Sequence, residues 1–320
     1  MAEIDINNAI EDWPQLVELE KYLSKCSSGE WVFRGDSEDR YPTSTLERAF
    51  KSFDVKDDDK ATIEKKIIMD FQSSCHVHAP AAVPDKDDIM AWLALMRHYG
   101  APTRLVDFTY SLFIATYFAV ESWEAKDTPQ ETRIAEDCPH KNKIPVVWAV
   151  NRSWLSKYLD DYVLMQGVDG ATRGKMKVSW QSIDDHNAFN RLFYFREPKD
   201  VDFVAVLNTF KKNERILVQQ GLFLAANDVE KPFYSVLKKM KDADDNVKKI
   251  KIVDCAHEIL PRLYRAGVNR ASLFPGLQGF SESLRPKILT YREADKVRKD
   301  SWNWLFPFRC SKWTFFRKKR

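Results

Sequence analysis

The sequence predicts an α+β protein in which helices surround a mixed β-sheet. Short apolar runs suited to buried strands, such as Val146–Val150, occur irregularly among longer segments whose apolar residues recur at helical spacing. The 320 residues are 44% hydrophobic and 13% aromatic, enough for one large core or two modest domains. We find no internal repeat and no linker long enough to mark a clean domain boundary.

The helices expected in the first hundred residues have physical start or stop signals. Pro14 opens the first helix, which leads to a short buried strand at 31–33. The aspartates of 54–59 are placed to cap a second helix. A third helix runs from about 89 to 99 and stops at Gly100.

Strands and helices are predicted to mix along the rest of the chain. A short strand around Leu105 leads into a helix that begins near Leu112, and the polar residues 124–143 read as an exposed loop. Residues 238–251 carry mixed charge typical of a solvated helix and loop. The later strands are expected at 146–150, about 201–207, about 215–224 and 250–253.

Composition narrows the function classes. Fifty basic and 47 acidic residues leave a net charge of +3, which is too small to produce the strong positive electrostatic field expected of a dedicated nucleic-acid-binding protein. Five scattered cysteines without a C-x-x-C pair favour a reducing compartment, and Cys138 with His140 does not complete a zinc site, so no metal is expected. The chain opens without a secretory leader and has no run of ~20 apolar residues, so we expect a cytoplasmic protein that does not insert into membranes.

Polar residues gather at the ends of two short predicted strands. Arg34 and Gly35 end the first strand, placing a fixed cation beside a backbone that tolerates close approach, an end suited to phosphate. Arg104 and Asp107 flank the second strand, and Thr109 follows at its far end. We expect the two segments to build one site.

These segments resemble the FRG domain family, named for the Phe33-Arg34-Gly35 triplet. The resemblance covers most of residues 31–284, between an N-terminal helix in 1–30 and a C-terminal tail at 285–320. It implies a bacterial or phage-related toxin or antiphage effector. The further blocks that carry it are 42–48, 96–109, 115–119, 215–223 and 267–279.

A looser similarity connects the chain to ADP-ribosyltransferases of the arginine-serine-glutamate type, which share the Arg-Gly strand end and a Ser/Thr-bearing strand before an Ala-x-x-Phe-Ala helix. It implies an ADP-ribosyltransferase-like fold that consumes NAD. Gln220 stands where those enzymes carry glutamate, so Asp107, Glu121 or Glu214 would supply the negative charge. The implied catalytic residues are Asp107, Glu214 and Gln220, and the implied cofactor-binding residues are Arg34, Gly35, His98, Arg104, Thr109 and Tyr117.

Each of these residues also has a structural interpretation. Arg34 could form a salt bridge with Asp36 or Asp107, and His98 could complement the dipole at a helix C-terminus. Tyr117 lies in an apolar stripe typical of core, and residues 219–221 could end a strand in a turn. The alternative function is therefore a non-catalytic FRG module that recognises nucleic acid or a partner protein.

The last twenty residues interleave aromatic and basic side chains, ending in Arg317-Lys-Lys-Arg320. Such a tail could stack on unpaired bases, dock a partner protein, or pack on the chain's own core. The partners expected are thus NAD, an acceptor that is RNA, DNA or protein, and an antitoxin or chaperone.

Overall fold

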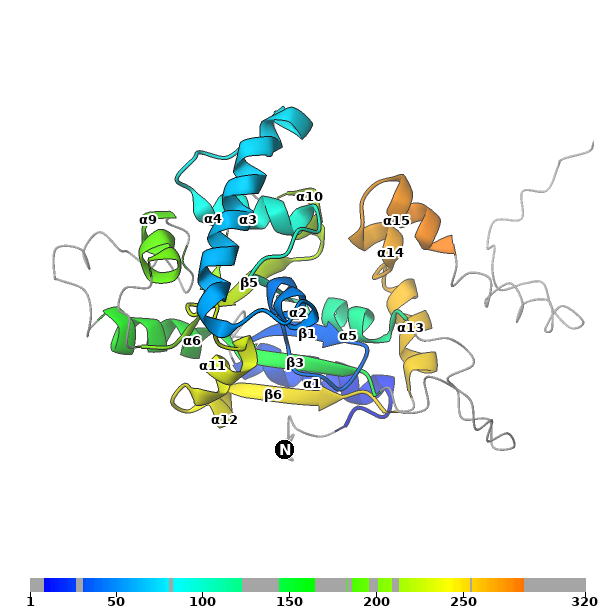
Figure 1. Cartoon of the computed structure of the whole chain (residues 1–320). Helices are drawn as coiled ribbons and strands as arrows, with labels where there is room; N and C mark the ends of the chain where they lie inside the picture. Colours follow the sequence, from blue (N-terminus) through cyan, green and yellow to red (C-terminus); the bar gives the residue numbers. More distant parts are fainter. Residues whose placement is uncertain are drawn as a thin grey trace, which may run out of the picture.

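The computed structural model confirms the α+β class (Figure 1) and describes residues 9–26, 31–80, 83–122, 144–164, 183, 186–195, 201–208, 213–253 and 255–284. Six strands form one sheet in the order β4-β5-β2-β1-β3-β6. The sequence predicts a mixed sheet; in the described residues all five ladders are antiparallel, and parallel pairing is limited to two isolated bridges. The strands are β1 (Trp31–Asp36), β2 (Val106–Thr109), β3 (Val146–Asn151), β4 (Val204–Leu207), β5 (Gly221–Ala226) and β6 (Val247–Lys251).

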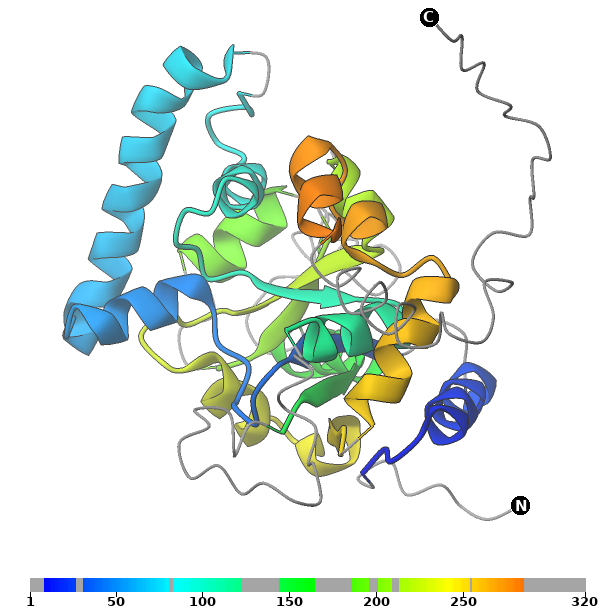
Figure 2. The same ribbon diagram turned by 90° about the vertical axis from the view of Figure 1, so that its right-hand side faces the viewer.

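Helices cover both faces of the sheet and enclose two hydrophobic cores. One core lies beneath α1 (Trp13–Cys26), α5 (Leu112–Val120) and α13 (Ala256–Arg265). The other lies beneath α3 (Asp57–His78) and α4 (Ile89–His98), and Figure 2 shows α3 and α1 on opposite sides of the molecule. None of the helices in the described part of the chain has the length and apolar character needed to cross a membrane.

The remaining helical segments are short and connect or border the strands. They are α2 (Thr45–Ser52), α6 (Arg152–Tyr158), the π-helical segments η3 (Leu159–Leu164) and η4 (Asn190–Tyr194), α9 (His186–Phe189), α10 (Glu214–Val218), α11 (Phe233–Lys239), α12 (Ala243–Asn246), α14 (Arg270–Leu273) and α15 (Leu277–Glu282).

Helix α5 lies unusually close to strand β1. A Cβ atom added at Gly35 would lie 1.9 Å from the carbonyl oxygen of Ala115 and 2.7 Å from the amide nitrogen of Ala119. Side chains alternate along a strand, so the glycine faces α5 while Arg34 and Asp36 face the other side of the sheet. The close backbone approach expected at Gly35 is made by a helix, and the predicted role of this glycine in binding a phosphate stays a prediction.

The sheet divides between β1 and β2. These strands are in register at a single residue pair, Phe33 with Thr109, whereas β1 pairs with β3 over six residues and β2 pairs with β5 over four. Beyond Phe33, the guanidinium of Arg34 donates a hydrogen bond of 3.1 Å to the carbonyl oxygen of Asp107. Two half-sheets, β4-β5-β2 and β1-β3-β6, therefore separate at this point, and an arginine side chain bridges them.

Several predicted boundaries need correction. The predicted strand at 215–224 is wrong in its first half, because residues 214–218 form helix α10 and β5 begins at Gly221. Asn213 caps this helix by accepting a 2.8 Å hydrogen bond from the Ile216 amide, and Gln220 has a φ of 48°, which separates helix from strand. Strand β6 starts at Val247, inside a segment predicted to be helix and loop.

The Gly35–α5 contact leads to a stability prediction. Gly35→Ala should lower the free energy of unfolding by about 3 kcal/mol or more, because the new methyl group meets backbone atoms that cannot rotate away. Urea denaturation would measure the effect. Gly221→Ala is the matched control, since its Cβ would lie no closer than 3.4 Å to any neighbouring atom and should change stability by less than about 1 kcal/mol. Equal stability of the two variants would contradict the packing argument.

Candidate ligand-binding cleft

A cleft of about 230 Å³ opens where the C-terminal end of α4 and helix α10 approach strands β2 and β5. Asp107 and His98 are the residues of the predicted site that line it. The complete lining is Ala94, Arg97, His98, Gly100, Asp107, Asn213, Arg215, Ile216, Gln219 and Phe223.

Asp107 supplies the one carboxylate among the described residues of the lining. Its side chain is 47% exposed, and the guanidinium of Arg97 contacts both carboxylate oxygens, with Nε donating to Oδ2 at 3.0 Å. Burial opposes ionisation of Asp107, but the charges of Arg97, Arg34 and Arg215 outweigh it and hold the carboxyl pKa below its usual range. Asp107 is therefore a fixed negative charge at neutral pH.

Two further titratable groups face the same space. Burial lowers the pKa of Arg215, with Asp107 opposing that shift and Arg97 adding to it, although the guanidinium remains charged. Burial and the charge of Arg215 also lower the pKa of His98, so its imidazole is neutral at neutral pH. The cleft thus combines two guanidinium cations, one carboxylate and one neutral histidine.

Arg34 lies beside the cleft without lining it. Its side chain is 14% exposed, its Nε donates to Asp36 at 3.0 Å, and Nη1 donates to the carbonyl oxygen of Asp107. Asp36 is itself buried and also accepts from Arg40 at 3.0 Å. These contacts agree with the alternative interpretation, in which Arg34 holds two strands together.

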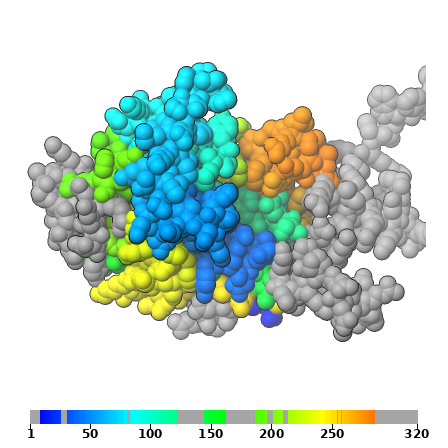
Figure 3. All heavy atoms as spheres, in the orientation of Figure 1, coloured from blue at the N-terminus to red at the C-terminus, as the bar shows by residue number. Residues whose placement is uncertain are grey.

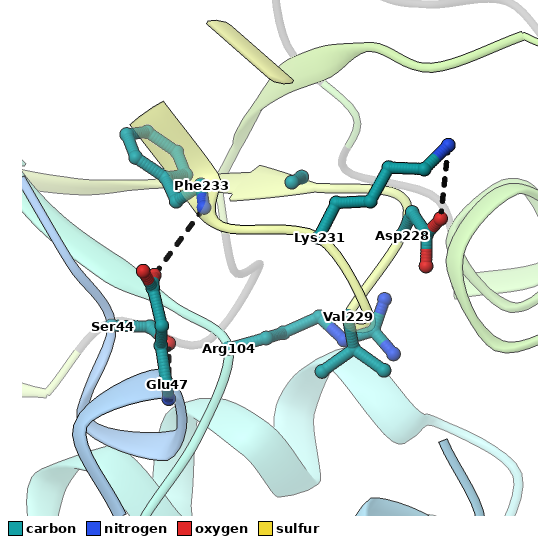
Figure 4. A pocket seen from close by; sticks show the side chains of 8 residues that line it. Ser44, Glu47, Arg104, Asp228, Val229, Lys231 and Phe233 are labelled. Atoms are coloured by element: carbon teal, nitrogen blue, oxygen red, sulfur yellow. Dashed lines mark hydrogen bonds and ion pairs between the residues drawn. The ribbon is translucent and has the colours of Figure 1, made fainter. Parts of the chain in front are cut away.

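Arg104 is held in a separate buried network. Its Nε donates to Glu64 at 2.7 Å, and Nη1 donates to the carbonyl oxygens of Phe193 and Asn227. A cavity of about 20 Å³ lies next to it, with room for about one water molecule (Figure 4). Its guanidinium and the Glu64 carboxylate together connect α3, η4 and the end of β5.

The other residues predicted for the site lie outside the cleft lining, and their functional roles stay predictions. Thr109 is buried, donates to the carbonyl oxygen of Gln219 at 2.7 Å and accepts from the Ser111 amide at 3.1 Å. Tyr117 is buried against Tyr264, and burial raises its pKa.

Two of the three predicted catalytic residues are also outside the lining. Glu214 is exposed in the first turn of α10, and Gln220 is exposed in the turn that follows the helix. Glu121, considered as another source of negative charge, pairs with Arg270 at 3.0 Å, and burial raises the pKa of its carboxyl. Asp107 is therefore the predicted catalytic candidate that the structure brings into the cleft.

The structure adds cleft residues that the sequence reasoning missed. Arg97 falls inside the family-like block at 96–109, in which the resemblance implies a role for the neighbouring His98. Arg215 lies on α10 and Gln219 is the C-terminal cap of that helix, in a segment that the sequence predicts to be a strand. The Asn-Glu-Arg start of α10 was the available signal, because asparagine followed by an acidic residue is typical of a helix N-terminus.

The predicted absence of a metal remains untested, although the described residues contain no group of three or more metal-ligating side chains. Chemically, the cleft is suited to bind an anion through its guanidinium groups and to stabilise a developing positive charge through Asp107. The 124–143 loop, Cys138, His140 and the 285–320 tail lie outside the described residues.

Removing Arg97 should raise the pKa of Asp107. Arg97→Gln deletes the main charge that favours the ionised form, and carbon-13 NMR titration of the carboxyl group would measure the shift. A carboxyl group whose pKa is depressed in the folded state stabilises the fold at pH values above its unfolded pKa of about 3.9, and this contribution is lost as the pH falls through the folded pKa. The variant lacks the contribution and should therefore lose less stability on acidification. Arg48→Gln is the control, because Arg48 bonds to Thr43 and forms no ion pair among the described residues. An unchanged Asp107 pKa in Arg97→Gln would contradict the described ion pair.

Comparison with known proteins identifies part of this architecture. Searches of curated proteins and of solved structures found no match to the chain. A protein-family model described as FRG domain matches residues 29–128, a segment that runs from before β1 to beyond α5 and includes Arg97, His98 and Asp107. The blocks at 215–223 and 267–279 lie beyond that match. The protein therefore contains an FRG domain at residues 29–128.

Proposed function

We propose that the protein is an NAD-dependent ADP-ribosyltransferase whose reaction takes place in the cleft. The observation that carries the proposal is the ionised, half-exposed carboxylate of Asp107, which faces the cleft beside Arg97 and Arg215. Guanidinium groups suit a diphosphate, and a fixed carboxylate suits the oxocarbenium-like cation that forms when nicotinamide leaves.

The arrangement of strands supports the proposal. The three elements that carry the transferase resemblance are the Arg34 strand β1, the Thr109 strand β2, and β5 with Gln219–Gln220 at its start. These strands are adjacent in the sheet, in the order β5-β2-β1. Thr109 is directly linked to the third element through its hydrogen bond to the carbonyl oxygen of Gln219. Segments more than a hundred residues apart in sequence therefore lie side by side in the sheet.

In the proposed reaction, the bond between the ribose C1′ and the nicotinamide nitrogen breaks, and nicotinamide leaves with the bonding electron pair. Asp107 stabilises the ribose cation, and the acceptor nucleophile forms the new bond at C1′ while losing a proton. Neutral His98 is the group in the cleft suited to accept that proton. A volume of about 230 Å³ is below the ~300–1,000 Å³ of sites that enclose a drug-sized ligand, so the cleft holds part of the dinucleotide.

The acceptor and the biological role belong to the same proposal. The family resemblance favours a toxin or antiphage effector, restrained by an antitoxin or chaperone, that modifies RNA, DNA or protein. The basic residues of the C-terminal sequence are compatible with a nucleic-acid acceptor or with an acidic neutralising partner.

A non-catalytic FRG binding module is the second candidate, and specific contacts favour it. Arg34 and Thr109 use their polar groups in internal hydrogen bonds, and Gln220 is exposed outside the cleft lining. Such a module would use the same arginines to bind an anionic ligand without breaking a bond. Binding and turnover must therefore be measured separately.

The transferase proposal predicts that Asp107→Asn lowers turnover by about 10²- to 10³-fold, because the amide keeps the shape but removes the negative charge. The purified protein would be incubated with NAD radiolabelled in the adenylate portion, together with RNA, DNA and cell protein, and both label transfer and nicotinamide release would be measured. Labelling of one fraction by the wild-type protein would also identify the acceptor class.

Asp70→Asn is the matched control, since Asp70 is exposed on α3 away from the cleft lining. Its turnover and melting temperature should equal those of the wild type. Binding of NAD with no nicotinamide release or label transfer by a folded wild-type protein would replace the transferase with the binding module. Full turnover by Asp107→Asn would remove Asp107 from the mechanism.

A further inference from the structure

The phenyl ring of Phe274 contacts two arginine side chains. The guanidinium carbon of Arg215 lies over the phenyl ring at 4.6 Å from its centroid, and that of Arg270 lies over the same ring at 3.9 Å. Arg215 lines the cleft, whereas Arg270 lies outside its lining.

Arg270, the outer cation, is fixed by two carboxylates. It contacts Glu121, the C-terminal cap of α5, at 3.0 Å and Glu282 of α15 at 2.6 Å, and its side chain is only 27% exposed. This pairing satisfies the charge of Arg270 and holds one face of the Phe274 ring. Phe118 of α5 contacts the same ring edge-to-face at 6.1 Å. Helix α5, through Phe118, and helix α15, through the Glu282–Arg270 pair, thus help to fix the position of the Phe274 ring.

The same segment is connected directly to α10. The Gln219 side chain donates a 2.9 Å hydrogen bond to the carbonyl oxygen of Leu273, immediately before Phe274. Figures 1 and 2 show α14 and α15 next to α10, and in Figure 3 the orange α14–α15 segment adjoins the cyan and teal atoms of the neighbouring part of the molecule. The α14–α15 segment therefore supports the helix that forms one wall of the cleft.

Arg215, the inner cation, has a different set of partners. In the described residues its guanidinium stacks on Phe274 but forms no hydrogen bond or ion pair. Arginine carries its N–H donors around the edge of the planar group, and those of Arg215 bond to no group in the described residues. A guanidinium held in this way loses little conformational entropy when an anion binds its edge.

We propose that Arg215 binds a phosphate group of the ligand and that Phe274 is the positioning residue that holds its guanidinium ready to do so. Arg97 is partly neutralised by Asp107, which leaves Arg215 as the cation of the lining that pairs with no carboxylate among the described residues. The inference rests on the proposed function only for the identity of the ligand as NAD. Recognition of phosphate itself can be measured without turnover.

The test is isothermal titration calorimetry of the full chain with inorganic pyrophosphate and, separately, with NAD. Arg215→Ala should weaken pyrophosphate binding by about 10- to 100-fold, through loss of a charge-assisted contact. Phe274→Leu should weaken it by about 3- to 10-fold, because Arg215 keeps its charge but loses the stacking that orients it. Phe274→Tyr retains a ring and should restore wild-type affinity.

Arg262→Ala provides a matched control for losing an arginine stacked on an aromatic ring. Arg262 lies over Trp13 at 5.9 Å and pairs with Glu258, and none of the three lines the cleft. This variant should bind pyrophosphate like the wild type, and all variants should be compared by melting temperature. If Phe274→Leu does not fold, the pair Arg215→Ala and Arg215→Lys replaces it, with lysine expected to restore less than the full affinity because it cannot stack in the same plane.

The results distinguish this inference from the transferase proposal. Pyrophosphate binding that depends on Arg215 and on the ring at 274 supports the inference, even if nicotinamide is never released. Wild-type affinity in both Arg215→Ala and Phe274→Leu overturns it, even if the protein transfers ADP-ribose. Absence of pyrophosphate and NAD binding by the folded wild-type protein also overturns it.

Discussion

The contact between helix α5 and strand β1 constrains the rest of the site. Ala115 and Ala119 bring the helix backbone so close to the strand that only glycine can occupy position 35. Because strand side chains alternate, Gly35 facing α5 forces Arg34 to face the opposite side of the sheet. There its guanidinium reaches the carbonyl oxygen of Asp107 across the separated strands. The Phe-Arg-Gly sequence thus describes a packing requirement and its consequence for the neighbouring arginine.

The arginines of the predicted site and of the cleft differ in how far their charges are already paired within the protein. Arg34 and Arg104 each have a carboxylate and at least one backbone carbonyl as partners, so binding another anion would require breaking existing contacts. Arg97 has Asp107, which remains half-exposed to the cleft. Arg215 has only an aromatic ring for a partner among the described residues. Unmet hydrogen-bonding capacity, more than the number of positive charges, therefore favours Arg215 as the anion-binding group.

The sequence predicted the scaffold better than the cleft, for physical reasons. Helices α1, α4 and α5 and strand β3 have strong local signals in apolar periodicity, caps and terminators. The turn at Gln220 has no such signal, because a non-glycine residue with positive φ depends on the contacts around it. The sequence therefore predicts a strand where α10 lies, and it predicts Gln220 and not Gln219 as a site residue. Arg104 and Glu64 become partners only through tertiary packing, which spacing in the sequence cannot indicate.

The two sides of the cleft come from different parts of the chain. The FRG domain at 29–128 contributes Arg97, His98 and Asp107, whereas Arg215 and the Phe274 segment that supports it lie well beyond residue 128. A chain could keep the FRG scaffold, including the Gly35 contact, and still differ in the group that meets the ligand. The family match thus covers β1, β2 and the carboxylate side of the cleft, while α10 forms the other side from beyond that match.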